Sequence, residues 1–299
     1  MKIAIVGNGQ IGQAIFYLLK SNPLNKRYSI EVYDKKPAKN KSLETLQNCV
    51  TGASFVFLCI PSWTEEEALL KMAPFIKSKT ILISLSKGIN MTTHKSVDKL
   101  IEKNLKNAKY ALLSGPMFAK EIKKGKPSFA ILASKDKKVF KKISALFLDT
   151  TLKLEYSKEV HPVAISAVLK NIYTLLFGLV DSFKESNNLK GFLASRSLKE
   201  MIQIMKMLKL NSKIIFEISG LGDFIATCES QYSQNRKAGI EIFQKGYATL
   251  KSEGLISLPL LLKMLGRKSK KLPLLSLLER IIVNKKDPEK EIKKFLKNS

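Results

Sequence analysis

The chain has 299 residues and 45% of them are hydrophobic, which is enough for two domains with sizeable cores and excludes a disordered protein. Its net charge of +27 raises nucleic acid as a partner, but only five of the 52 basic residues are arginine, the side chain that nucleic-acid readers favour. The lysines are spread along the chain, which predicts a basic solvated surface and no specific nucleic-acid partner.

The first half of the chain alternates short apolar runs with helical patterns. The run over residues 3–6 is broken at once by Gly7, so we expect a buried strand and no signal peptide. Near-continuous apolar strands joined by helices favour a parallel sheet that is covered on both faces. Strands are predicted over residues 3–6, 30–33, 55–60, 81–85, 110–113 and 129–133, and helices between them include residues 13–20 and 65–76.

Beyond about Ser157 the apolar spacing becomes helical. The longest apolar stretch, residues 163–183, holds Lys170 and Asn171, which a bilayer would penalise, so it predicts a buried helix and no membrane insertion. Three widely spaced cysteines in no metal-ligand pattern are typical of a reduced, cytoplasmic protein. We therefore expect an α/β, Rossmann-type domain with a doubly wound, mostly parallel sheet over residues 1–157, and an all-α domain over residues 158–299.

A glycine motif, Gly7-x-Gly9-x-x-Gly12, follows the first predicted strand and opens a helix. Glycines at this spacing allow a tight turn and let a pyrophosphate approach the helix N-terminus. Asp34 ends the second predicted strand, 22 positions after Gly12, where its carboxylate can accept hydrogen bonds from the adenosine ribose. This carboxylate would repel a 2′-phosphate, which favours NAD as the cofactor, whereas Lys35 and Lys36 keep NADP open.

The glycine motif is the first of five that run in order from residue 7 to residue 236. The others are SLSKG at residues 84–88, SGPMFAKE at 114–121, VLKN at 168–171, and a region from 220 to 236 that contains GLGD and SQNR. Their order and spacing resemble those of the bacterial NAD(P)-dependent glycerol-3-phosphate dehydrogenases. The resemblance implies hydride transfer between NAD(P)H and dihydroxyacetone phosphate, which gives glycerol 3-phosphate for glycerophospholipid biosynthesis in the cytoplasm.

Lys170 is the residue that we expect to act as acid and base. It lies in an apolar helix, where burial disfavours the charged amine and lowers its pKa, and a nearby Lys87 would lower that pKa further. A lysine tuned towards neutrality can take the hydroxyl proton of a secondary alcohol, or polarise the ketone in the reverse reaction. The resemblance implies this role for Lys170, and Asp223 is expected to orient the lysine or the substrate.

The resemblance also implies which residues bind cofactor and substrate. Asn235 and Arg236, at a predicted helix start, bring an amide and a guanidinium that suit a phosphate ester. The expected cofactor-binding residues are Gly7, Gly9, Gln10, Ile11, Gly12, Asp34, Lys87, Ala119 and Glu253. The expected substrate-binding residues are Lys87, Gly115, Lys170, Asp223, Ser233, Asn235 and Arg236. No metal-ligand set is expected, and His94 and His161 are expected to be capping or surface residues.

Several positions depart from the family pattern and leave alternatives open. Met117 replaces a serine, Gln234 an arginine, Ile11 an aromatic residue and Ala164 a glutamate. Losing one charge-assisted phosphate contact costs about 1.5–3 kcal/mol, so a related dehydrogenase for another small hydroxy or keto acid is the first alternative. A dinucleotide-binding paralogue without activity is the second, against which the retention of Lys87, Lys170 and Asp223 argues. A homodimer also stays open.

Overall fold

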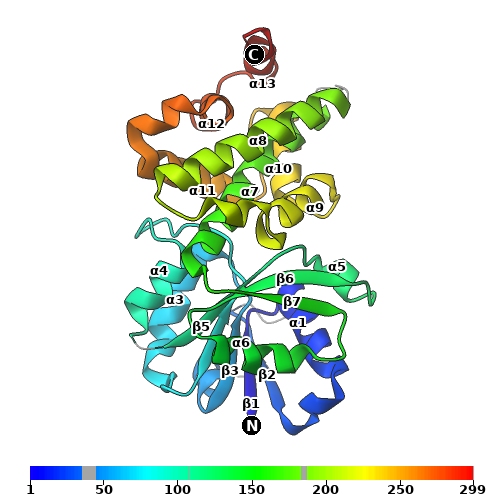
Figure 1. The fold of residues 1–299 in the computed structure, drawn as a ribbon, viewed down its shortest axis with the longest axis vertical. Helices are drawn as coiled ribbons and strands as arrows, with labels where there is room; N and C mark the ends of the chain where they lie inside the picture. Colours follow the sequence, from blue (N-terminus) through cyan, green and yellow to red (C-terminus); the bar gives the residue numbers. More distant parts are fainter. Residues whose placement is uncertain (36–44, 107, 183–186, 299) are drawn as a thin grey trace. The chain divides into compact units, whose positions relative to one another are not determined.

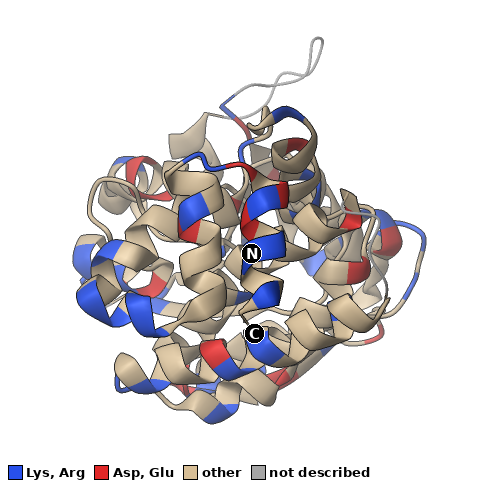
Figure 2. Cartoon of the chain, turned by 90° about the horizontal axis from the view of Figure 1, so that it is seen from above, with Lys and Arg blue, Asp and Glu red and all other residues tan. Residues whose placement is uncertain are grey.

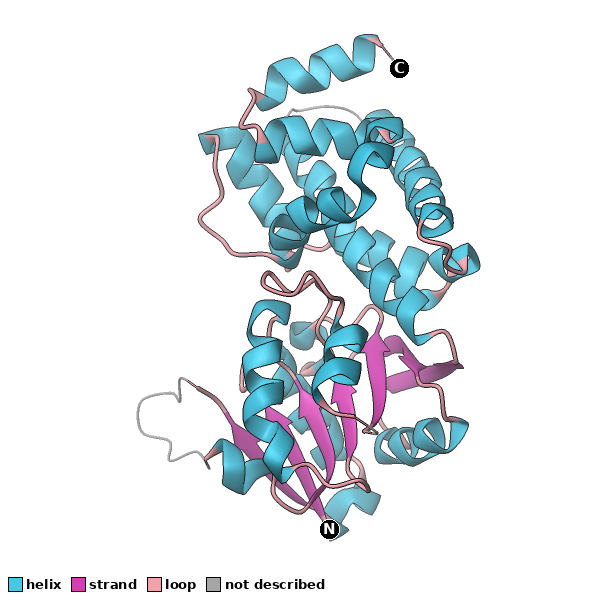
Figure 3. Ribbon diagram, turned by 90° about the vertical axis from the view of Figure 1, so that its left-hand side faces the viewer, coloured by secondary structure: helices cyan, strands magenta, loops and turns pink. Residues whose placement is uncertain are grey.

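The computed structural model describes residues 1–35, 45–106, 108–182 and 187–298. The chain divides into two compact units, one made of residues 1–90 and 95–164, and the other of residues 91–94 and 165 onward (Figure 1). The described strands all belong to the first unit, and helices make up the second (Figure 3).

Within the described residues, seven strands form one sheet in the order β2-β1-β3-β4-β5-β6-β7 (Figure 1). Neighbouring strands pair in parallel except β5 and β6, which are antiparallel, so the predicted mostly parallel sheet is confirmed. The strands are β1 Lys2–Val6, β2 Ser29–Tyr33, β3 Ala53–Leu58, β4 Ile81–Ser84, β5 Lys109–Ser114, β6 Ser128–Ala133 and β7 Leu152–Ser157.

Strand β7 is the one described strand that the sequence analysis does not predict. It pairs only with β6 at the edge of the sheet, and of its residues only Leu152 is buried. An edge strand that is largely half-exposed does not need a continuous apolar run, which is the signal that identifies the central strands.

Helices cover both faces of this sheet, as a doubly wound fold requires (Figure 3). The turn η3 contacts α1 and α6, and the short α5 contacts α1, whereas α3 contacts both α2 and α4. Apolar residues of α1 such as Ile15 and Leu18 pack with Ile5 and Phe57 of the central strands. The helices of this unit are α1 Gln10–Ser21, η1 Pro23–Arg27, α2 Leu46–Val50, α3 Ser62–Met72, η2 Ala73–Phe75, α4 Val97–Asn104, α5 Ala119–Ile122, α6 Lys137–Ser144 and η3 Ala145–Phe147.

The long helix α7, Val160–Ser182, carries most of the apolar stretch singled out in the sequence; residue 183 lies outside the described residues. By length and composition α7 could cross a membrane, but its apolar window is buried throughout within the fold, as predicted. The other helices of the second unit are α8 Asn187–Met207, η4 Ser212–Phe216, η5 Ile218–Gly222, α9 Asp223–Glu229, α10 Gln234–Lys245, α11 Glu253–Leu265, η6 Gly266–Lys271, α12 Pro273–Leu278, η7 Glu279–Val283 and α13 Pro288–Lys297.

The place where one unit gives way to the other lies inside α7. Strand β7 ends at Ser157 and α7 begins at Val160, whereas the compact units divide between Ala164 and Ile165. A helix that starts in one unit and continues into the next separates the change of secondary structure from the division of the packing. A domain boundary at Ser157 therefore remains a proposal that is based on the sequence pattern alone.

Candidate active site

The glycine turn follows β1 at the point where the strand order of the sheet reverses, with β2 on one side of β1 and β3 on the other. Ligands of open α/β sheets bind outside the carboxyl ends of the strands at such a switch point. Gly7 has a φ of +104°, and a Cβ there would lie 2.5 Å from the carbonyl oxygen of Cys59. A Cβ on Gly12 would lie 1.9 Å from the carbonyl oxygen of Gly7. The packing of the protein itself thus requires both glycines.

Gly9 is different, because a Cβ at this position would meet no atom within 4 Å. It directly precedes α1, and its carbonyl accepts a hydrogen bond from the backbone N–H of Gln13 at 3.0 Å. The first turn of α1 carries no acidic residue, and Gln10 at its start is exposed. Close approach of a pyrophosphate to the α1 amides is the requirement that explains a glycine here, so the turn fits a dinucleotide.

A cavity of about 340 Å³ adjoins the turn and is lined by the ends of β1, β2 and β3 and by α3. Asp34 lies in this lining, directly after β2. Its Oδ2 accepts a hydrogen bond from the backbone N–H of Asn8 at 2.6 Å. The carboxylate that is expected to bind the ribose therefore also holds the glycine turn in place.

Two lysines at the same cavity are engaged by one carboxylate. Glu67 on α3 accepts from Lys71 at 2.8 Å and from Lys35 at 3.1 Å, and these bonds hold the pKa of Glu67 below its usual range. The three side chains are about half or more exposed, so the bonds are individually weak. Lys36, the other cation that kept NADP open, lies outside the described residues.

Lys87 follows β4 and is half-buried. Its Nζ donates to the carbonyl of Gly115, just past β5, at 3.0 Å. A Cβ on Gly115 would lie 2.3 Å from the carbonyl oxygen of Phe129, so this glycine lets β5 and β6 approach closely. Met117 and Ala119 pack against the apolar core of the first unit. At position 117 the chain therefore has an apolar contact with the core, where the family pattern has a serine hydroxyl.

Lys170 lies near the middle of α7 and only 5% of it is exposed. Its Nζ lies 3.2 Å from Oδ2 of Asp223 and donates to Oγ1 of Thr227 at 3.0 Å. The Thr227 hydroxyl in turn donates to Oδ1 of Asp223 at 3.2 Å. Burial disfavours the ammonium form of the lysine, whereas the carboxylate favours it. The three side chains thus form a buried, hydrogen-bonded group around the lysine amine.

A short π-helical turn aims Asp223 at the lysine. The turn, η5, leads directly into α9, of which Asp223 is the first residue. A Cβ on Gly220 would lie 2.4 Å from the carbonyl oxygen of Ile215, so a larger residue would push this turn away. Gly220 and Gly222 predict a turn between two elements, but residues 218–222 are helical and continue directly into α9. Single π turns inside helical segments are frequent at functional sites.

Asn235 joins three helices next to the lysine. Its Nδ2 donates to Oδ1 of Asn171 on α7 at 2.8 Å, and its own Oδ1 accepts from the backbone N–H of Gly254 on α11 at 2.9 Å. A Cβ on Gly254 would lie 2.3 Å from the Asn171 carbonyl oxygen. Glu253, the first residue of α11, is half-buried beside this junction. Asn171 directly follows Lys170 in α7, so this junction lies one residue along the helix from the lysine.

Ser233 and Arg236 are engaged within the protein. Ser233 caps α10, because its Oγ accepts from the backbone N–H of Arg236 at 3.2 Å. The Arg236 side chain pairs through Nε with Asp181, and its NH1 donates to the carbonyl of Glu229 at 3.2 Å. Asp181 also pairs with Lys190 at 2.6 Å. The substrate-binding roles of Ser233 and Arg236 remain predictions, and Arg236 would have to fulfil its role while it is paired with Asp181.

Thr227 is the residue of the buried group that the sequence analysis does not name. It lies four positions after Asp223, so both side chains project from one face of α9. That spacing is readable in the sequence, but only once the segment is known to be helical. The two groups that contain the expected residues lie in separate units, with the glycine turn, Lys87 and Gly115 in the first and Lys170, Asp223 and Asn235 in the second.

Family models match both parts of the chain. The model described as the N-terminus of NAD-dependent glycerol-3-phosphate dehydrogenase matches residues 25–140, and the model described as its C-terminus matches residues 159–293. A glycerol-3-phosphate dehydrogenase [NAD(P)+] from Fusobacterium nucleatum is 28% identical over 266 residues, which cover 82% of this chain and 79% of that protein. The enzyme of the same name from Clostridium botulinum is 26% identical, with 99% of this chain and 97% of that protein covered.

Solved structures agree at the level of the fold. The crystal structure of glycerol-3-phosphate dehydrogenase from Coxiella burnetii superposes with a TM-score of 0.88 at 21% identity, and covers 99% of this chain and 98% of that one. The expected Rossmann-type domain followed by helices is confirmed. The two family matches together span most of the sequence, in the order that the motifs indicated. The chain therefore belongs to the NAD-dependent glycerol-3-phosphate dehydrogenase family.

Proposed function

We propose that this protein is an NAD(P)-dependent sn-glycerol-3-phosphate dehydrogenase that interconverts dihydroxyacetone phosphate and glycerol 3-phosphate. The observation that carries the proposal is the buried group of Lys170, Asp223 and Thr227 in a chain of this family. A lysine enclosed in an apolar helix and held by a carboxylate suits proton transfer to a ketone oxygen, which is the proton step of this reaction.

The reaction needs a hydride and a proton at adjacent atoms. When bound, the dinucleotide supplies the hydride to the carbonyl carbon of dihydroxyacetone phosphate. Lys170 then gives its proton to the carbonyl oxygen, and in the reverse direction takes the proton from the hydroxyl. Asp223 and Thr227 contact the Nζ atom and so fix its position in the buried group.

We assign the substrate phosphate to Asn235 and Arg236, as the family resemblance implies, and keep Lys87 as a substrate-binding residue. Asn235 is held in position by Asn171 and Gly254, and Lys87 by Gly115. Gln234 can donate hydrogen bonds but carries no charge, so the phosphate loses one charge-assisted contact relative to the family pattern. We further propose that NAD is the preferred cofactor, that the protein acts in the cytoplasm, and that a homodimer is compatible with the activity.

A second candidate function keeps the same proton chemistry on another small hydroxy or keto acid. Met117 and Gln234 favour it, because one removes a hydroxyl and the other a charge that a phosphorylated substrate would use. One assay separates the two functions: NADH oxidation with dihydroxyacetone phosphate against pyruvate, ketopantoate and other keto acids. We expect kcat/KM for dihydroxyacetone phosphate to exceed that of each keto acid by about a hundredfold or more. A keto acid that is reduced faster would assign the protein to the second function.

The net charge of +27 gives a separate prediction about partners. Lysines and arginines lie on many elements, with acidic residues among them (Figure 2). We expect DNA binding that is weak, independent of sequence and lost near physiological salt, because dispersed lysines provide only counterion release. Fluorescence anisotropy with two unrelated duplexes, at low and at physiological salt, measures this. Tight binding of one duplex alone in physiological salt would show a nucleic-acid function.

A further inference from the structure

A second cavity, of about 890 Å³, lies inside the helical unit and includes none of the residues assigned to cofactor or substrate. One stripe of α8, the segment from η6 to η7, and α13 form its walls. We propose that this cavity binds a polyphosphate anion, such as the triphosphate of a nucleotide. Two observations support this proposal. Basic side chains outnumber acidic ones in the lining of the cavity, and several of the basic side chains form no ion pair within the described chain.

Positive charge predominates in the lining. It contains six basic side chains, namely Arg196, Lys199, Lys270, Lys271, Arg280 and Lys294, but only two acidic ones, Glu200 and Glu279. A concave surface lined by one sign of charge focuses the field and attracts counterions far more than a flat surface does. The cavity therefore favours an anion with several charges over a neutral ligand.

Both carboxylates already have partners within the protein. Glu200 is 5% exposed and accepts hydrogen bonds from the Tyr173 hydroxyl at 2.8 Å and from the backbone N–H groups of Leu274 and Leu275 at 2.7 and 3.0 Å. Burial raises the pKa of Glu200, and the charge of Arg196 acts in the opposite direction. Glu279 pairs with Lys270 at 2.9 Å.

Within the described residues, three of the six cations form no ion pair, and a fourth, Arg196, interacts with Glu200 only at longer range. Arg280 pairs with Glu291 at 2.5 Å, but across the described chain no carboxylate lies within ion-pair distance of Lys199, Lys271 or Lys294. The guanidinium of Arg196 lies over the ring of Phe192, 5.4 Å from its centroid. These four side chains come from α8, η6 and α13, so they reach the cavity from three elements.

The remaining lining suits a phosphorylated ligand that carries a ring. Gln203, Ser276, Asn284 and Asn298 are neutral side chains that can donate hydrogen bonds to phosphate oxygens. Phe192 and Phe295, with ring centroids 6.4 Å apart, provide an apolar wall on which a base can pack. Inorganic triphosphate and a nucleoside triphosphate carry the same anionic group. Only the nucleoside triphosphate has a base that can pack on the two phenylalanine rings.

A ligand in this cavity would lie beside a group that is connected to the candidate active site. Glu200 lines the cavity and bonds to Tyr173, which is three positions after Lys170 on α7.

The experiment is a calorimetric titration of the full chain at physiological ionic strength, with NADH and glycerol 3-phosphate present to fill the other sites. The ligands are inorganic triphosphate, ATP and AMP. We expect one equivalent of triphosphate and of ATP to bind, and AMP to bind more weakly. The double variant Lys199→Gln with Lys294→Gln should weaken triphosphate binding by about tenfold or more, because it removes two lining charges that come from different helices, α8 and α13. ATP that binds tighter than triphosphate, with the difference lost in Phe295→Ala, would place the base on the aromatic wall.

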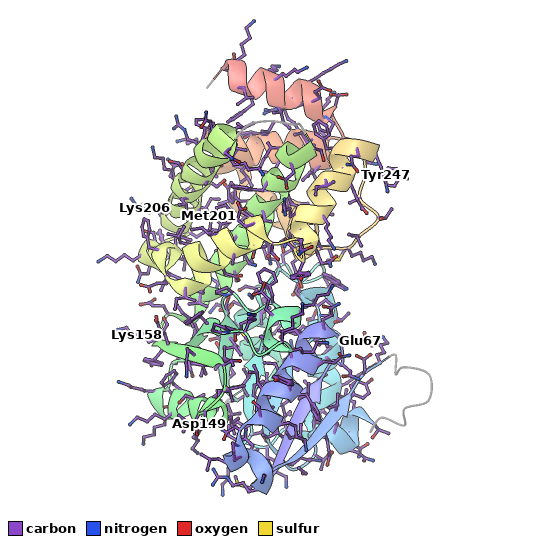
Figure 4. All side chains as sticks on the ribbon, turned by 90° about the vertical axis from the view of Figure 1, so that its right-hand side faces the viewer. Glu67, Asp149, Lys158, Met201, Lys206 and Tyr247 are labelled. Atoms are coloured by element: carbon purple, nitrogen blue, oxygen red, sulfur yellow. The ribbon has the colours of Figure 1, made fainter. Side chains whose placement is uncertain are left out.

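Lys206→Gln is the matched control, because Lys206 is exposed on the same helix and does not line the cavity (Figure 4). It should change the affinity by less than about twofold, as expected for one exposed charge outside the site. The proposal fails if triphosphate shows no saturable binding, or if Lys206→Gln weakens it as much as the double variant. It also fails if the double variant changes the molar mass by light scattering, since the lysines would then mediate contact between copies of the chain. Unchanged melting temperatures in the variants show that the fold is intact.

Discussion

The two candidate sites of this molecule are built from different parts of the chain. The dinucleotide turn is made by backbone: Gly7 and Gly12 are required by close contacts, and Gly9 leaves the amides of α1 accessible. The group around Lys170 is made by side chains from two helices that come together only in the folded chain. A site made by backbone is encoded in a few consecutive residues, whereas a site made by side chains depends on packing over long distances in sequence. The two should therefore respond differently to substitution.

The largest expected effect concerns Lys170. Lys170→Met keeps a good helix former of similar length and should lower kcat by about 10²–10⁴, the usual contribution of a positioned acid or base. NADH affinity, measured by fluorescence titration, should be unchanged, because the glycine turn belongs to the other unit. Lys170→Arg should not restore turnover, because a guanidinium does not lose its proton at working pH. Near-normal kcat in Lys170→Met, with saturating dihydroxyacetone phosphate, would exclude the lysine as the acid.

The structure adds a control to this experiment. Removing the lysine leaves the buried carboxylate of Asp223 without its cation, which destabilises a folded protein. The double variant Lys170→Met with Asp223→Asn removes that charge and keeps a hydrogen-bonding group beside Thr227. It should recover the melting temperature that Lys170→Met loses, but not the turnover. Recovery of turnover as well would mean that Lys170 acts only by holding the fold.

Two glycine substitutions test the backbone site. Gly12→Ala places a Cβ 1.9 Å from a backbone oxygen and should lower both the melting temperature and NADH affinity. Gly9→Ala meets no protein atom within 4 Å and should leave the melting temperature unchanged. Gly9→Ala should still lower the affinity for NADH by about tenfold, or 1.4 kcal/mol, because the added methyl group occupies the space of the pyrophosphate. Equal NADH affinity in Gly9→Ala and the parent would contradict the placement of the pyrophosphate at this turn.

The same contrast explains how much could be predicted from the sequence. The central strands and the glycine turn are local patterns, and they lie where the sequence places them. Strand β7 carries too little apolar pattern to be predicted, because it lies at the edge of the sheet. Gly220 and Gly222 predict a turn because glycines usually interrupt helices, whereas the segment is the helical η5. Neither error changes the fold class, since the remaining strands already determine the parallel sheet.

Residue patterns alone do not predict long-range partners; the pairing of Lys170 with Asp223 is expected only through the family resemblance. The pairing of Lys170 with Thr227 joins residues 57 positions apart, and nothing near either residue indicates the other. His161, expected to be a cap or a surface residue, instead lies with its Nδ1 2.8 Å from Oδ2 of the buried Asp98, 63 positions away. Helices α7 and α10 approach closely because Gly178 and Gly239 lack side chains, which brings Asn235 to Asn171. Such contacts depend on how helices pack, which residue patterns indicate only in part.

A smaller effect is expected on the choice of cofactor. Asp34 lies in the cavity beside the glycine turn, so NADH should bind more tightly than NADPH, and Asp34→Ala should narrow the difference. Glu67→Gln should also narrow the difference between NADH and NADPH affinity, by strengthening NADPH binding. The substitution releases Lys35 and Lys71 from their shared carboxylate, so both cations can contact a 2′-phosphate. Because these side chains are exposed, we expect a change of about two- to fivefold in NADPH affinity and almost none for NADH. Tighter NADPH binding by the unsubstituted protein would contradict the assignment of Asp34.

The smallest expected effect concerns a carboxylate in the first unit that is remote from the glycine turn. Burial raises the pKa of Glu102, but hydrogen bonds from Lys135, Lys99 and Tyr110 outweigh burial and lower the pKa to about 2. A carboxyl whose pKa is lower in the folded than in the unfolded protein contributes stability above its ordinary pKa near 4.5, and loses it as the pH falls towards 2. Solvent screens this partly exposed group, so we expect Glu102→Gln to cost at most about 1 kcal/mol at pH 7.

Thermal unfolding of Glu102→Gln and the parent protein between pH 7 and pH 3 measures this contribution. Glu102→Gln should melt a few degrees lower at pH 7, by about 2–4 °C per kcal/mol, and the difference should shrink as the pH falls below about 4.5. NADH affinity and kcat should match those of the parent, because Glu102 lies on α4 and takes no part in the glycine turn. A difference in melting temperature that stays constant across this pH range would show that the charge of Glu102 is not what stabilises the contact, and that its packing against Tyr110 is.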